Sequence, residues 1–277
     1  MASPVLQNGA AAATTAGRAV LGGRHAVVTG ASRGIGAAIA DHLAGLGANL
    51  TLIGRDAATL APRQRELAER HNIEAAAVVA DVTDPDQVAA AMAAASDRFG
   101  PPDILINNAG AAESAPFAKT DAALLSRMIE VNLGGTFHMT RLAVPAMVEA
   151  GFGRIVNIAS TAGLIGYRYT TAYCAAKHAV IGLTRSLALE LAKTGVTVNA
   201  VCPGFTDTDL VAGAIANIVE KTGKNEAEAK ALLAATNPQG RLVEPAEVAA
   251  AVGWLCRPDA GAMTGQAIAV AGGEVMG

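Results

Sequence analysis

Cysteine is scarce in this sequence: the 277 residues contain only Cys174, Cys202 and Cys256. Three scattered cysteines cannot form a disulfide framework, and no C-x-x-C or H-E-x-x-H spacing is present that would predict a metal site. These absences favour a protein of the reducing cytoplasm that binds no metal. We expect all three cysteines to be small buried residues, although Cys174 could alternatively be open to thiol reagents.

Charge is also sparse, because charged residues make up 16% of the chain and the net charge is −3. Such a sequence has no basic field for nucleic acid or an acidic membrane surface, so we expect a small-molecule partner. Hydrophobic residues make up 52%, and there are 30 glycines. This composition predicts one compact α/β domain with a large core.

Long apolar runs are absent: no stretch holds eighteen uncharged apolar residues, so a membrane span is not expected. Residues 1–22 are rich in Ala, Gly and Thr and lack the basic and apolar regions of a signal peptide. We interpret them as a disordered tail, followed by one catalytic domain over residues 23–277.

From Arg24 onward, short apolar runs alternate with amphipathic segments. This alternation predicts a parallel sheet covered by helices on both faces, in a doubly wound α/β arrangement of the Rossmann type. The seven expected strands span residues 25–29, 48–53, 75–80, 104–107, 154–159, 196–201 and 267–270.

A glycine-rich turn follows the first expected strand and precedes a helix, in the order Thr29-Gly30-Ala31-Ser32-Arg33-Gly34-Ile35-Gly36. Glycines let the backbone approach a pyrophosphate closely, and the helix start offers free N–H groups. The position predicts a dinucleotide site contacted by Gly30, Ser32, Arg33, Gly34, Ile35 and Gly36, whereas a plain tight turn is the alternative.

The second expected strand ends at Gly54-Arg55-Asp56, where the adenosine ribose of a dinucleotide should lie. A glycine and an arginine offer space and positive charge to a 2′-phosphate, so NADP(H) is favoured over NAD(H). Arg33 could contact the same phosphate. Asp56 could instead compete for the ribose, which would favour NAD.

Tyr173 and Lys177 lie four residues apart in an expected helix and therefore share one of its faces. A phenol beside an ammonium suits proton transfer, because a nearby cation favours the phenolate. An ordinary amphipathic helix would explain the spacing equally well.

These features occur together in an ordered set. The chain resembles the short-chain dehydrogenase/reductase family from about Arg24 to Gly273. Its motifs match that family at the glycine turn, Asn107-Asn108-Ala109-Gly110, Asn132, Ser160 thirteen residues before Tyr173, the Y-x-x-x-K of Tyr173 and Lys177, and Pro203-Gly204.

The resemblance implies a catalytic role for four residues. Tyr173 would donate a proton to a carbonyl oxygen, Ser160 would hydrogen-bond that oxygen, and Lys177 would lower the pKa of Tyr173. Asn132 would hold a water that links Lys177 to solvent. Tyr173 and Lys177 would also contact the nicotinamide ribose.

The resemblance also implies further cofactor contacts after other strands. Asp81 and Val82 would meet the adenine, and a second group would line the adenosine ribose, the pyrophosphate and the nicotinamide. That group comprises Asn108, Ala109, Gly110, Pro203, Gly204, Phe205, Thr206 and Thr208. Turn formation is the alternative role of the Asn and Gly residues.

Two segments bear on the substrate. Residues 207–241 are expected to form a small lid of two helices, in which Ile215, Ile218 and Val219 either face an acyl chain or pack ordinarily. Tyr167-Arg168-Tyr169 either line the pocket mouth, with Arg168 meeting a substrate phosphate or carboxylate, or face solvent or another subunit.

Together with Gly54-Arg55, the resemblance implies an NADP-dependent enzyme that reduces a ketone. The expected substrate is a 3-oxoacyl thioester bound to CoA or a carrier protein, or a related β-keto or polyketide compound. An NAD-dependent 3-hydroxyacyl or secondary-alcohol dehydrogenase is the alternative. A non-catalytic dinucleotide sensor has no need of Ser160, Tyr173 and Lys177 together. The family also implies a homotetramer.

Overall fold

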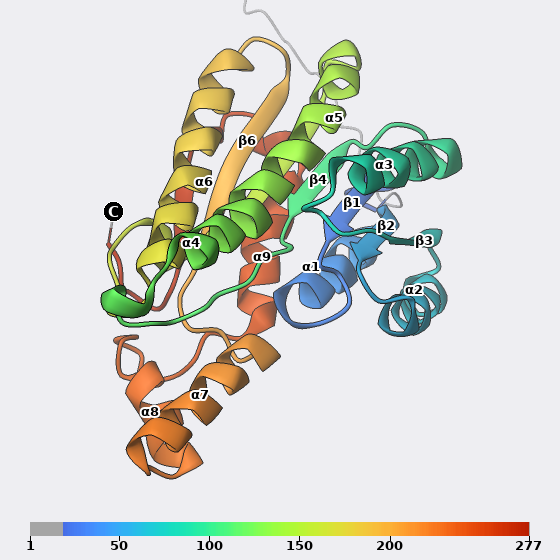
Figure 1. The fold of residues 1–277 in the computed structure, drawn as a ribbon. Helices are drawn as coiled ribbons and strands as arrows, with labels where there is room; N and C mark the ends of the chain where they lie inside the picture. The colour runs from blue at the N-terminus through green and yellow to red at the C-terminus, as the bar shows by residue number, and fades with distance from the viewer. Residues whose placement is uncertain (1–18, 277) are drawn as a thin grey trace, which may run out of the picture.

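The computed structural model describes residues 19–276, within which seven strands form one parallel sheet (Figure 1). The order of the strands across the sheet is β3-β2-β1-β4-β5-β6-β7. Their bounds are β1 His25–Thr29, β2 Asn49–Gly54, β3 Ala75–Val79, β4 Ile104–Asn107, β5 Gly153–Ile158, β6 Val196–Pro203 and β7 Ala267–Val270. The order reverses between β1 and β4, and ligands of open α/β sheets bind at such a reversal.

Helices cover both faces of the sheet. Three of them, α1 Gly34–Gly45, α2 Ala57–His71 and α9 Pro245–Cys256, pack on one face. The other face carries α3 Pro85–Phe99, α5 Gly135–Glu149 and α6 Thr171–Glu190, and α4 Ala122–Ile129 packs on α6. No helix in the described part of the chain is long and apolar enough to cross a membrane.

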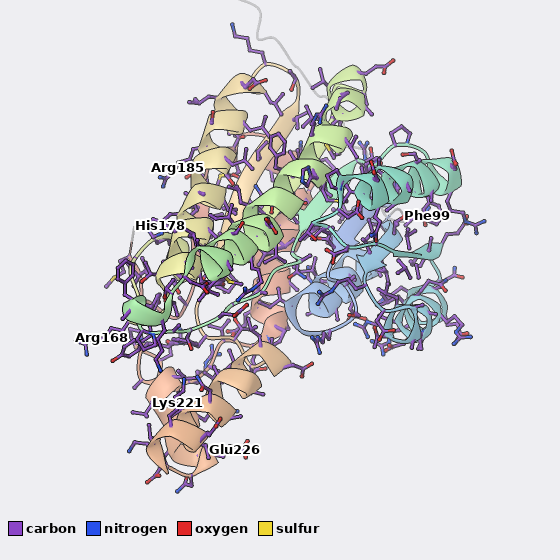
Figure 2. All side chains as sticks on the ribbon, in the orientation of Figure 1. Phe99, Arg168, His178, Arg185, Lys221 and Glu226 are labelled. Atoms are coloured by element: carbon purple, nitrogen blue, oxygen red, sulfur yellow. The ribbon has the colours of Figure 1, made fainter. Side chains whose placement is uncertain are left out.

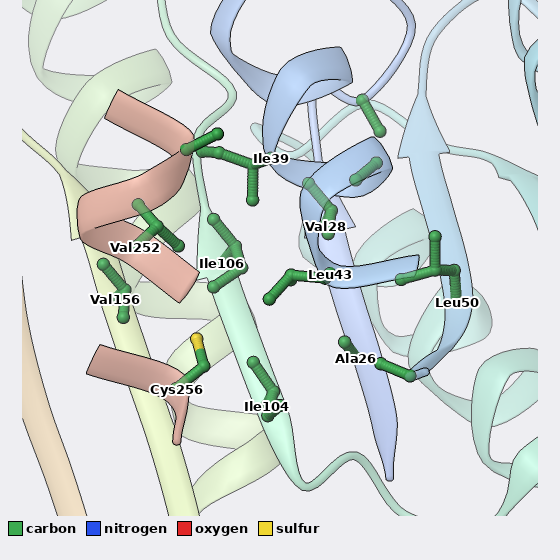
Figure 3. Packing of buried hydrophobic residues seen from close by; sticks show 14 of the residues in the cluster. Ala26, Val28, Ile39, Leu43, Leu50, Ile104, Ile106, Val156, Val252 and Cys256 are labelled. Carbon is green, nitrogen blue, oxygen red and sulfur yellow. The ribbon is translucent and has the colours of Figure 1, made fainter. Parts of the chain in front are cut away.

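The core consists of two apolar layers, one on each face of the sheet. Along β1, Ala26 and Val28 enter one layer and Val27 enters the other, because successive strand residues point to opposite faces. Figure 3 shows Ile39 of α1 near Ile106 of β4 in the first layer. A fully buried side chain of this size contributes about 1.5–3 kcal/mol, so the two layers hold the strand ends in place.

The seven predicted strands and their parallel pairing are confirmed, with ends that differ by one or two residues. Two of the helix starts are capped. Asp84 accepts hydrogen bonds from the first N–H groups of α3, and Glu244 forms a capping box with Glu247 at the start of α9. β6 extends beyond its predicted end, because Cys202 and Pro203 still pair with β7.

The predicted lid consists of α7 Asp209–Thr222 and α8 Glu226–Ala234, which project from the body of the molecule in Figure 1. Gly223 ends α7 with φ +70°, and Asn225 caps α8 in a capping box with Glu228. Ile215 packs with Ala229 of α8 in a small separate core. The apolar face of α7 therefore packs ordinarily, and it does not line an open acyl-chain site.

The tail predicted over residues 1–22 lies mostly outside the described residues. Leu21 is described and is fully buried, and its N–H donates to the Leu46 carbonyl at 2.8 Å. The packed domain therefore begins before residue 23, because an apolar side chain at position 21 fills the core beside α1.

Candidate functional site

The predicted site residues gather at the carboxyl edge of the sheet, where the loops after β1, β4, β5 and β6 meet. The Thr29 hydroxyl accepts hydrogen bonds from the backbone N–H groups of Asn108, at 2.9 Å, and Ala109, at 3.0 Å. In return, the Asn108 side-chain amide donates to the carbonyls of Thr29 and Gly30. These bonds fix the glycine turn against the loop after β4.

Thr29 was not among the predicted site residues, although it begins the glycine motif. Asn107 is the reverse case, since it belongs to the quoted motif but points away from this edge. Its amide donates to Thr140 and to Asn157 within the buried sheet. Successive residues of a strand point to opposite sides of the sheet. This alternation is the sequence signal that could have distinguished Asn108, at the site, from Asn107, in the core.

The glycine turn has the close packing that a dinucleotide site requires. Gly30 and Gly34 have φ values of +63° and +55°, which favour glycine. A Cβ on Gly36 would stand 2.2 Å from the Gly30 carbonyl oxygen, so no side chain fits there. Ile35 is half-buried against the core, and Ser32 is half-buried in the turn.

The start of α1 leaves backbone N–H groups free to bind an anion. Arg33 occupies the N-cap position without a side-chain cap, and the first turn contains no acidic residue. Both features favour a phosphate at the helix start. The Arg33 guanidinium is exposed and lies 3.6 Å from the Asp209 carboxylate of α7, a pair that contributes little at the surface.

The end of β2 separates the two residues that compete in the cofactor prediction. Asp56 accepts a hydrogen bond from the Ala58 N–H at 2.9 Å and caps α2. Arg55 is exposed, and its guanidinium forms no salt bridge within residues 19–276. The carboxylate is therefore engaged at the helix start, and the guanidinium remains available.

The loop after β3 holds Asp81 and Val82 in different surroundings. Asp81 accepts hydrogen bonds from the backbone N–H and the hydroxyl of Thr83, so its carboxylate stabilises a turn. Val82 is 7% exposed and packs where a Cβ on Gly135 would stand, at 2.6 Å. Val82 is therefore a core residue.

Ser160 lies just beyond β5 and begins the short 3-10 helix Thr161–Gly163. Its hydroxyl oxygen accepts a hydrogen bond from the Ala162 N–H at 3.1 Å. That bond orients the side chain and leaves the hydroxyl proton free to donate. Both roles considered for Ser160, a cap and a donor, are therefore compatible.

Tyr173 and Lys177 lie on the face of α6 that turns toward Ser160. The Lys177 Nζ atom lies 5.7 Å from the centre of the Tyr173 ring and donates to the Ile158 carbonyl at 2.8 Å. Lys177 is 5% exposed, and this burial lowers its pKa to about 8.

The pKa of Tyr173 moves in the direction opposite to the prediction. Burial raises it to about 12, and a hydrogen-bonding contact with Ser160 offsets only part of that effect. Lys177 is not among the groups that shift it. The expected lowering by Lys177 is therefore wrong for this structure, because removing the phenolate from water outweighs the ammonium at this separation. The Tyr173 phenol consequently keeps its proton at neutral pH.

Asn132 lies in a single π-helical turn, Glu130–Gly134, between α4 and α5. Its amide nitrogen donates to the carbonyls of Ala111 and Met128, at 2.9 and 3.0 Å. Its Oδ1 atom is buried without a partner in the described residues. A Cβ on Gly110 would stand 2.7 Å from that oxygen and 3.6 Å from Lys177 Nζ. Gly110 thus keeps open a space between the two, which fits the predicted water.

The loop after β6 closes the site on the side of the lid. Thr206 is buried and donates to the Gly204 carbonyl, whereas Thr208 donates to the Thr206 carbonyl. A Cβ on Gly34 would meet the Thr208 methyl group at 3.3 Å. The loop from Pro203 to Thr208 therefore joins the glycine turn to the start of α7.

The loop before α6 does not place its three bulky residues together. Arg168 and Tyr169 are exposed, and Figure 2 shows Arg168 at the margin of the molecule. Tyr169 has φ +67°, and its carbonyl accepts a hydrogen bond from the Ala115 N–H at 2.7 Å. Tyr167 alone turns inward, with its ring 6.0 Å from that of Phe205. The proposed mouth therefore consists of Tyr167 without Arg168.

Three proton-donating groups meet at this edge of the sheet. A half-buried phenol, a hydroxyl and a buried ammonium converge beside a turn that suits a pyrophosphate. Within residues 19–276, no group of three or more His, Cys, Asp or Glu side chains could hold a metal ion. The arrangement suits proton donation to an oxygen next to a bound dinucleotide.

Comparison with known proteins agrees with this geometry. The short chain dehydrogenase family model matches residues 24–218. A ketoacyl reductase of the granaticin polyketide synthase from Streptomyces violaceoruber is 44% identical over 250 residues, which cover 90% of this chain and 92% of the relative. A D-beta-hydroxybutyrate dehydrogenase from Rhizobium meliloti is 38% identical, with 90% and 97% covered.

A crystal structure of an actinorhodin polyketide ketoreductase variant with NADPH superposes with a TM-score of 0.87. It is 40% identical, and the match covers 91% of this chain and 97% of that one. The chain therefore belongs to the short-chain dehydrogenase family, whose members are NAD(P)-dependent oxidoreductases that act on CH–OH groups.

Proposed function

We propose that this protein is an NADPH-dependent ketoreductase of 3-oxoacyl thioesters or related β-keto substrates. The observation that carries the proposal is the convergence of Ser160, Tyr173 and Lys177 beside the glycine turn. A protein that only bound a dinucleotide would gain nothing from a buried lysine and a half-buried tyrosine at that place. The relatives named as ketoacyl reductase and polyketide ketoreductase support the same substrate class.

Each of these residues has a separate role in ketone reduction. The cofactor supplies a hydride to the carbonyl carbon. Tyr173 donates its proton to the carbonyl oxygen, and Ser160 donates a hydrogen bond that holds this oxygen in line. Lys177 supplies the proton that replaces the one lost by Tyr173. Asn132 and the space beside Gly110 support a water through which the proton is replaced.

The preference for NADPH follows from the end of β2. Gly54 leaves room beside the ribose, and the exposed Arg55 can form charge-assisted hydrogen bonds to a 2′-phosphate. Asp56 already caps α2, which weakens its competition for the ribose hydroxyls. The NADPH in the actinorhodin ketoreductase crystal structure supports the same preference.

Replacing Arg55 with alanine should raise the KM for NADPH about 10- to 100-fold, the range expected when charged hydrogen bonds are lost. The KM for NADH should change by less than about threefold, because NADH has no 2′-phosphate. Both constants are measured from the absorbance of the reduced cofactor with acetoacetyl-CoA as substrate. Arg65→Ala is the matched control, since it removes an exposed arginine from α2.

Two results would contradict these assignments separately. Equal effects of Arg55→Ala on NADPH and NADH would contradict the cofactor preference. Failure of the wild-type protein to oxidise either cofactor with any of a set of β-keto thioesters and simple ketones would contradict the reductase itself.

Ketone reduction should fall as the pH rises above about 8. Lys177 has a pKa of about 8, so its ammonium, through which the proton of Tyr173 is replaced, is lost in this range. Tyr173 has a pKa of about 12 and keeps its proton below that pH. We expect kcat/KM to fall by up to about tenfold per pH unit between pH 8 and 10.

Titration of Lys177 does not unfold the protein as the pH rises, so unfolding would not explain the decline in kcat/KM. Its folded pKa of about 8 lies below its ordinary value of 10.5. The unfolded chain therefore binds more protons between these values, and the contribution of Lys177 to the free energy of unfolding rises with pH there. Circular dichroism at each pH provides the control. A flat profile from pH 7 to 10 in the folded enzyme would refute the role of Lys177.

A second candidate is an NAD-dependent dehydrogenase of 3-hydroxyacyl compounds or secondary alcohols. The relative from Rhizobium meliloti, named as a D-beta-hydroxybutyrate dehydrogenase, favours it. The same three residues can serve either direction, so the cofactor decides between the candidates. We rank NADPH-dependent reduction first because Arg55 is exposed and Asp56 caps α2.

The homotetrameric state and the cytoplasmic location are also part of the proposal. Leu125 and Phe137, on α4 and α5, are 44% and 47% exposed, which supports burial between copies in the proposed homotetramer. The three cysteines are free thiols, as expected for the proposed cytoplasmic location.

A further inference from the structure

The segment after β7 returns the chain to the catalytic edge of the sheet. Gly272 and Gly273 have φ values of +60° and +95°, and the Glu274 N–H donates to the Ala271 carbonyl at 3.1 Å. A Cβ on Gly272 would overlap the side chain of the buried Asn237. This turn is therefore tightly constrained, and it sets the position of Glu274.

The Glu274 side chain is the first link between this turn and the loop that carries the catalytic serine. Its Oε1 atom lies 2.7 Å from the Tyr167 hydroxyl, which lies 2.8 Å from the hydroxyl of Thr161. An ionised carboxylate can only accept, so Tyr167 donates to Glu274 and Thr161 donates to Tyr167. Burial raises the pKa of Tyr167 above its ordinary value, and the phenol therefore remains a donor.

The carboxylate fills the space between the C-terminal turn and the loop after β6. A Cβ on Gly204 would stand 2.9 Å from Oε2 of Glu274 and 3.1 Å from the Cβ of Ala271. Oε2 is buried and has no hydrogen-bond partner among residues 19–276. The bond from Tyr167 to Oε1 thus fixes the carboxylate, while a buried oxygen without a partner costs free energy. Proteins keep such costs mainly at functional sites.

Tyr167 is the central member of this chain of contacts. Its ring meets that of Phe205, in the loop after β6, edge to face with the ring centres 6.0 Å apart. Its hydroxyl contacts the C-terminal turn on one side and Thr161 on the other. Packing on the ring and hydrogen bonds at the hydroxyl together lock the rotamer of the side chain.

Thr161 passes this restraint to the catalytic serine. Thr161 is 3% exposed and directly follows Ser160 in the short 3-10 helix after β5. Its carbonyl accepts the N–H groups of Leu164 and Ile165, both at 2.9 Å. The Ser160 hydroxyl accepts from the Ala162 N–H within the same turn. A planar peptide joins residues 160 and 161, so a shift of Thr161 reorients the Ser160 hydroxyl.

We propose that Glu274 is a positioning residue that acts through Tyr167 and Thr161 on the hydroxyl of Ser160. Its carboxylate touches neither substrate nor cofactor. The C-terminal turn thereby sets the direction of the hydrogen bond that Ser160 donates to the carbonyl oxygen during ketone reduction. This inference rests on the proposed reductase function, and it assigns to that reaction a residue that belongs to none of the motifs of the site.

The test is a double-mutant cycle between Glu274→Ala and Ser160→Ala, with acetoacetyl-CoA and NADPH as substrates. In the wild-type background, Glu274→Ala should lower kcat about 10- to 100-fold, because a misplacement of about 1 Å can cost about 100-fold. In the Ser160→Ala background, the same change should lower kcat by less than about twofold, because no serine hydroxyl remains to be misplaced. The Kd for NADPH, from fluorescence titration, should stay within about threefold of the wild-type value.

Conservative changes test the individual hydrogen bonds. Glu274→Gln keeps an oxygen that accepts from Tyr167 and should keep kcat within about threefold of the wild type. Tyr167→Phe keeps the ring on Phe205 and removes both hydrogen bonds of the hydroxyl. Its loss of kcat should match that of Glu274→Ala, and combining the two changes should lower kcat no further. Glu190→Ala is the matched control, because Glu190 is exposed at the end of α6, and its kcat should be unchanged.

Urea unfolding shows whether each variant is folded. If Glu274→Ala does not fold, the cycle is run with Tyr167→Phe in its place. Three results each overturn the role of Glu274 and leave the reductase intact: an equal loss of kcat in both backgrounds, no loss in Glu274→Ala, or a loss in Glu274→Gln as large as in Glu274→Ala. Failure of the wild-type protein to reduce acetoacetyl-CoA, any other β-keto thioester or any simple ketone refutes the proposed function itself.

Discussion

Replacing Tyr173 with phenylalanine should lower kcat/KM for ketone reduction by about 10²- to 10⁴-fold, the usual contribution of a positioned general acid. The substitution removes one hydroxyl and keeps the ring, so the packing of α6 changes little. Tyr173 is the phenol in contact with Ser160, whereas Lys177 donates to the Ile158 carbonyl. The Kd for NADPH, measured by fluorescence titration, should change by less than about threefold.

Tyr169→Phe is the matched control for this substitution. Tyr169 loses the same hydroxyl, lies four residues earlier in the chain and is 62% exposed. Its activity should remain within about twofold of the wild type. If Tyr173→Phe kept more than a tenth of the wild-type kcat/KM, another proton donor would have to serve the reaction, and the assignment of Tyr173 would fail.

The strands were predictable because the helices bury both faces of the sheet. His25 to Thr29 in β1 are all buried, and such a strand appears in the sequence as a continuous apolar run between breaks. The ends were less certain, because they depend on the neighbouring strand. β6 continues to Pro203 only because β7 lies beside it, and this pairing has no local signal.

The spacing of the motifs also predicted which residues lie together at the carboxyl edge of the sheet. Gly36 lies in the first turn of the helix after β1, and Ser160 lies two residues after the end of β5, where their motifs placed them. The pKa of Tyr173 was not predictable, because its direction depends on how deeply helix α6 buries the phenol. A distance of four residues along a helix brings Lys177 close but does not measure burial.

Other features of the site depend on contacts between distant segments. The Asn132 amide nitrogen donates to the carbonyls of Ala111 and Met128, and this orientation leaves its oxygen without a partner in the described residues. Glu274 reaches Tyr167 across a separation of 107 residues. Ile215 packs against α8 because the two lid helices fold on each other. None of these outcomes has a signature within the local sequence.

Replacing Gly36 with alanine should weaken NADPH binding by about 10²-fold, the scale expected when a site is displaced by about 1 Å. The new methyl group would stand 2.2 Å from the Gly30 carbonyl oxygen and 2.4 Å from Asn108 Nδ2. The first atom belongs to the backbone of the phosphate-binding turn, and the second ties that turn to the loop after β4. Relief of the clash must therefore move the turn or break its hydrogen bonds.

The same change should lower the free energy of unfolding by about 1–3 kcal/mol, as overpacking of a close contact does. Gly182→Ala is the matched control, because Gly182 lies within α6 and a Cβ there meets nothing within 4 Å. Alanine in a helix should instead stabilise the protein by about 0.5–1 kcal/mol and leave NADPH affinity unchanged. Isothermal titration calorimetry and urea unfolding measure the two quantities. Wild-type affinity in Gly36→Ala would show that the pyrophosphate does not depend on this turn.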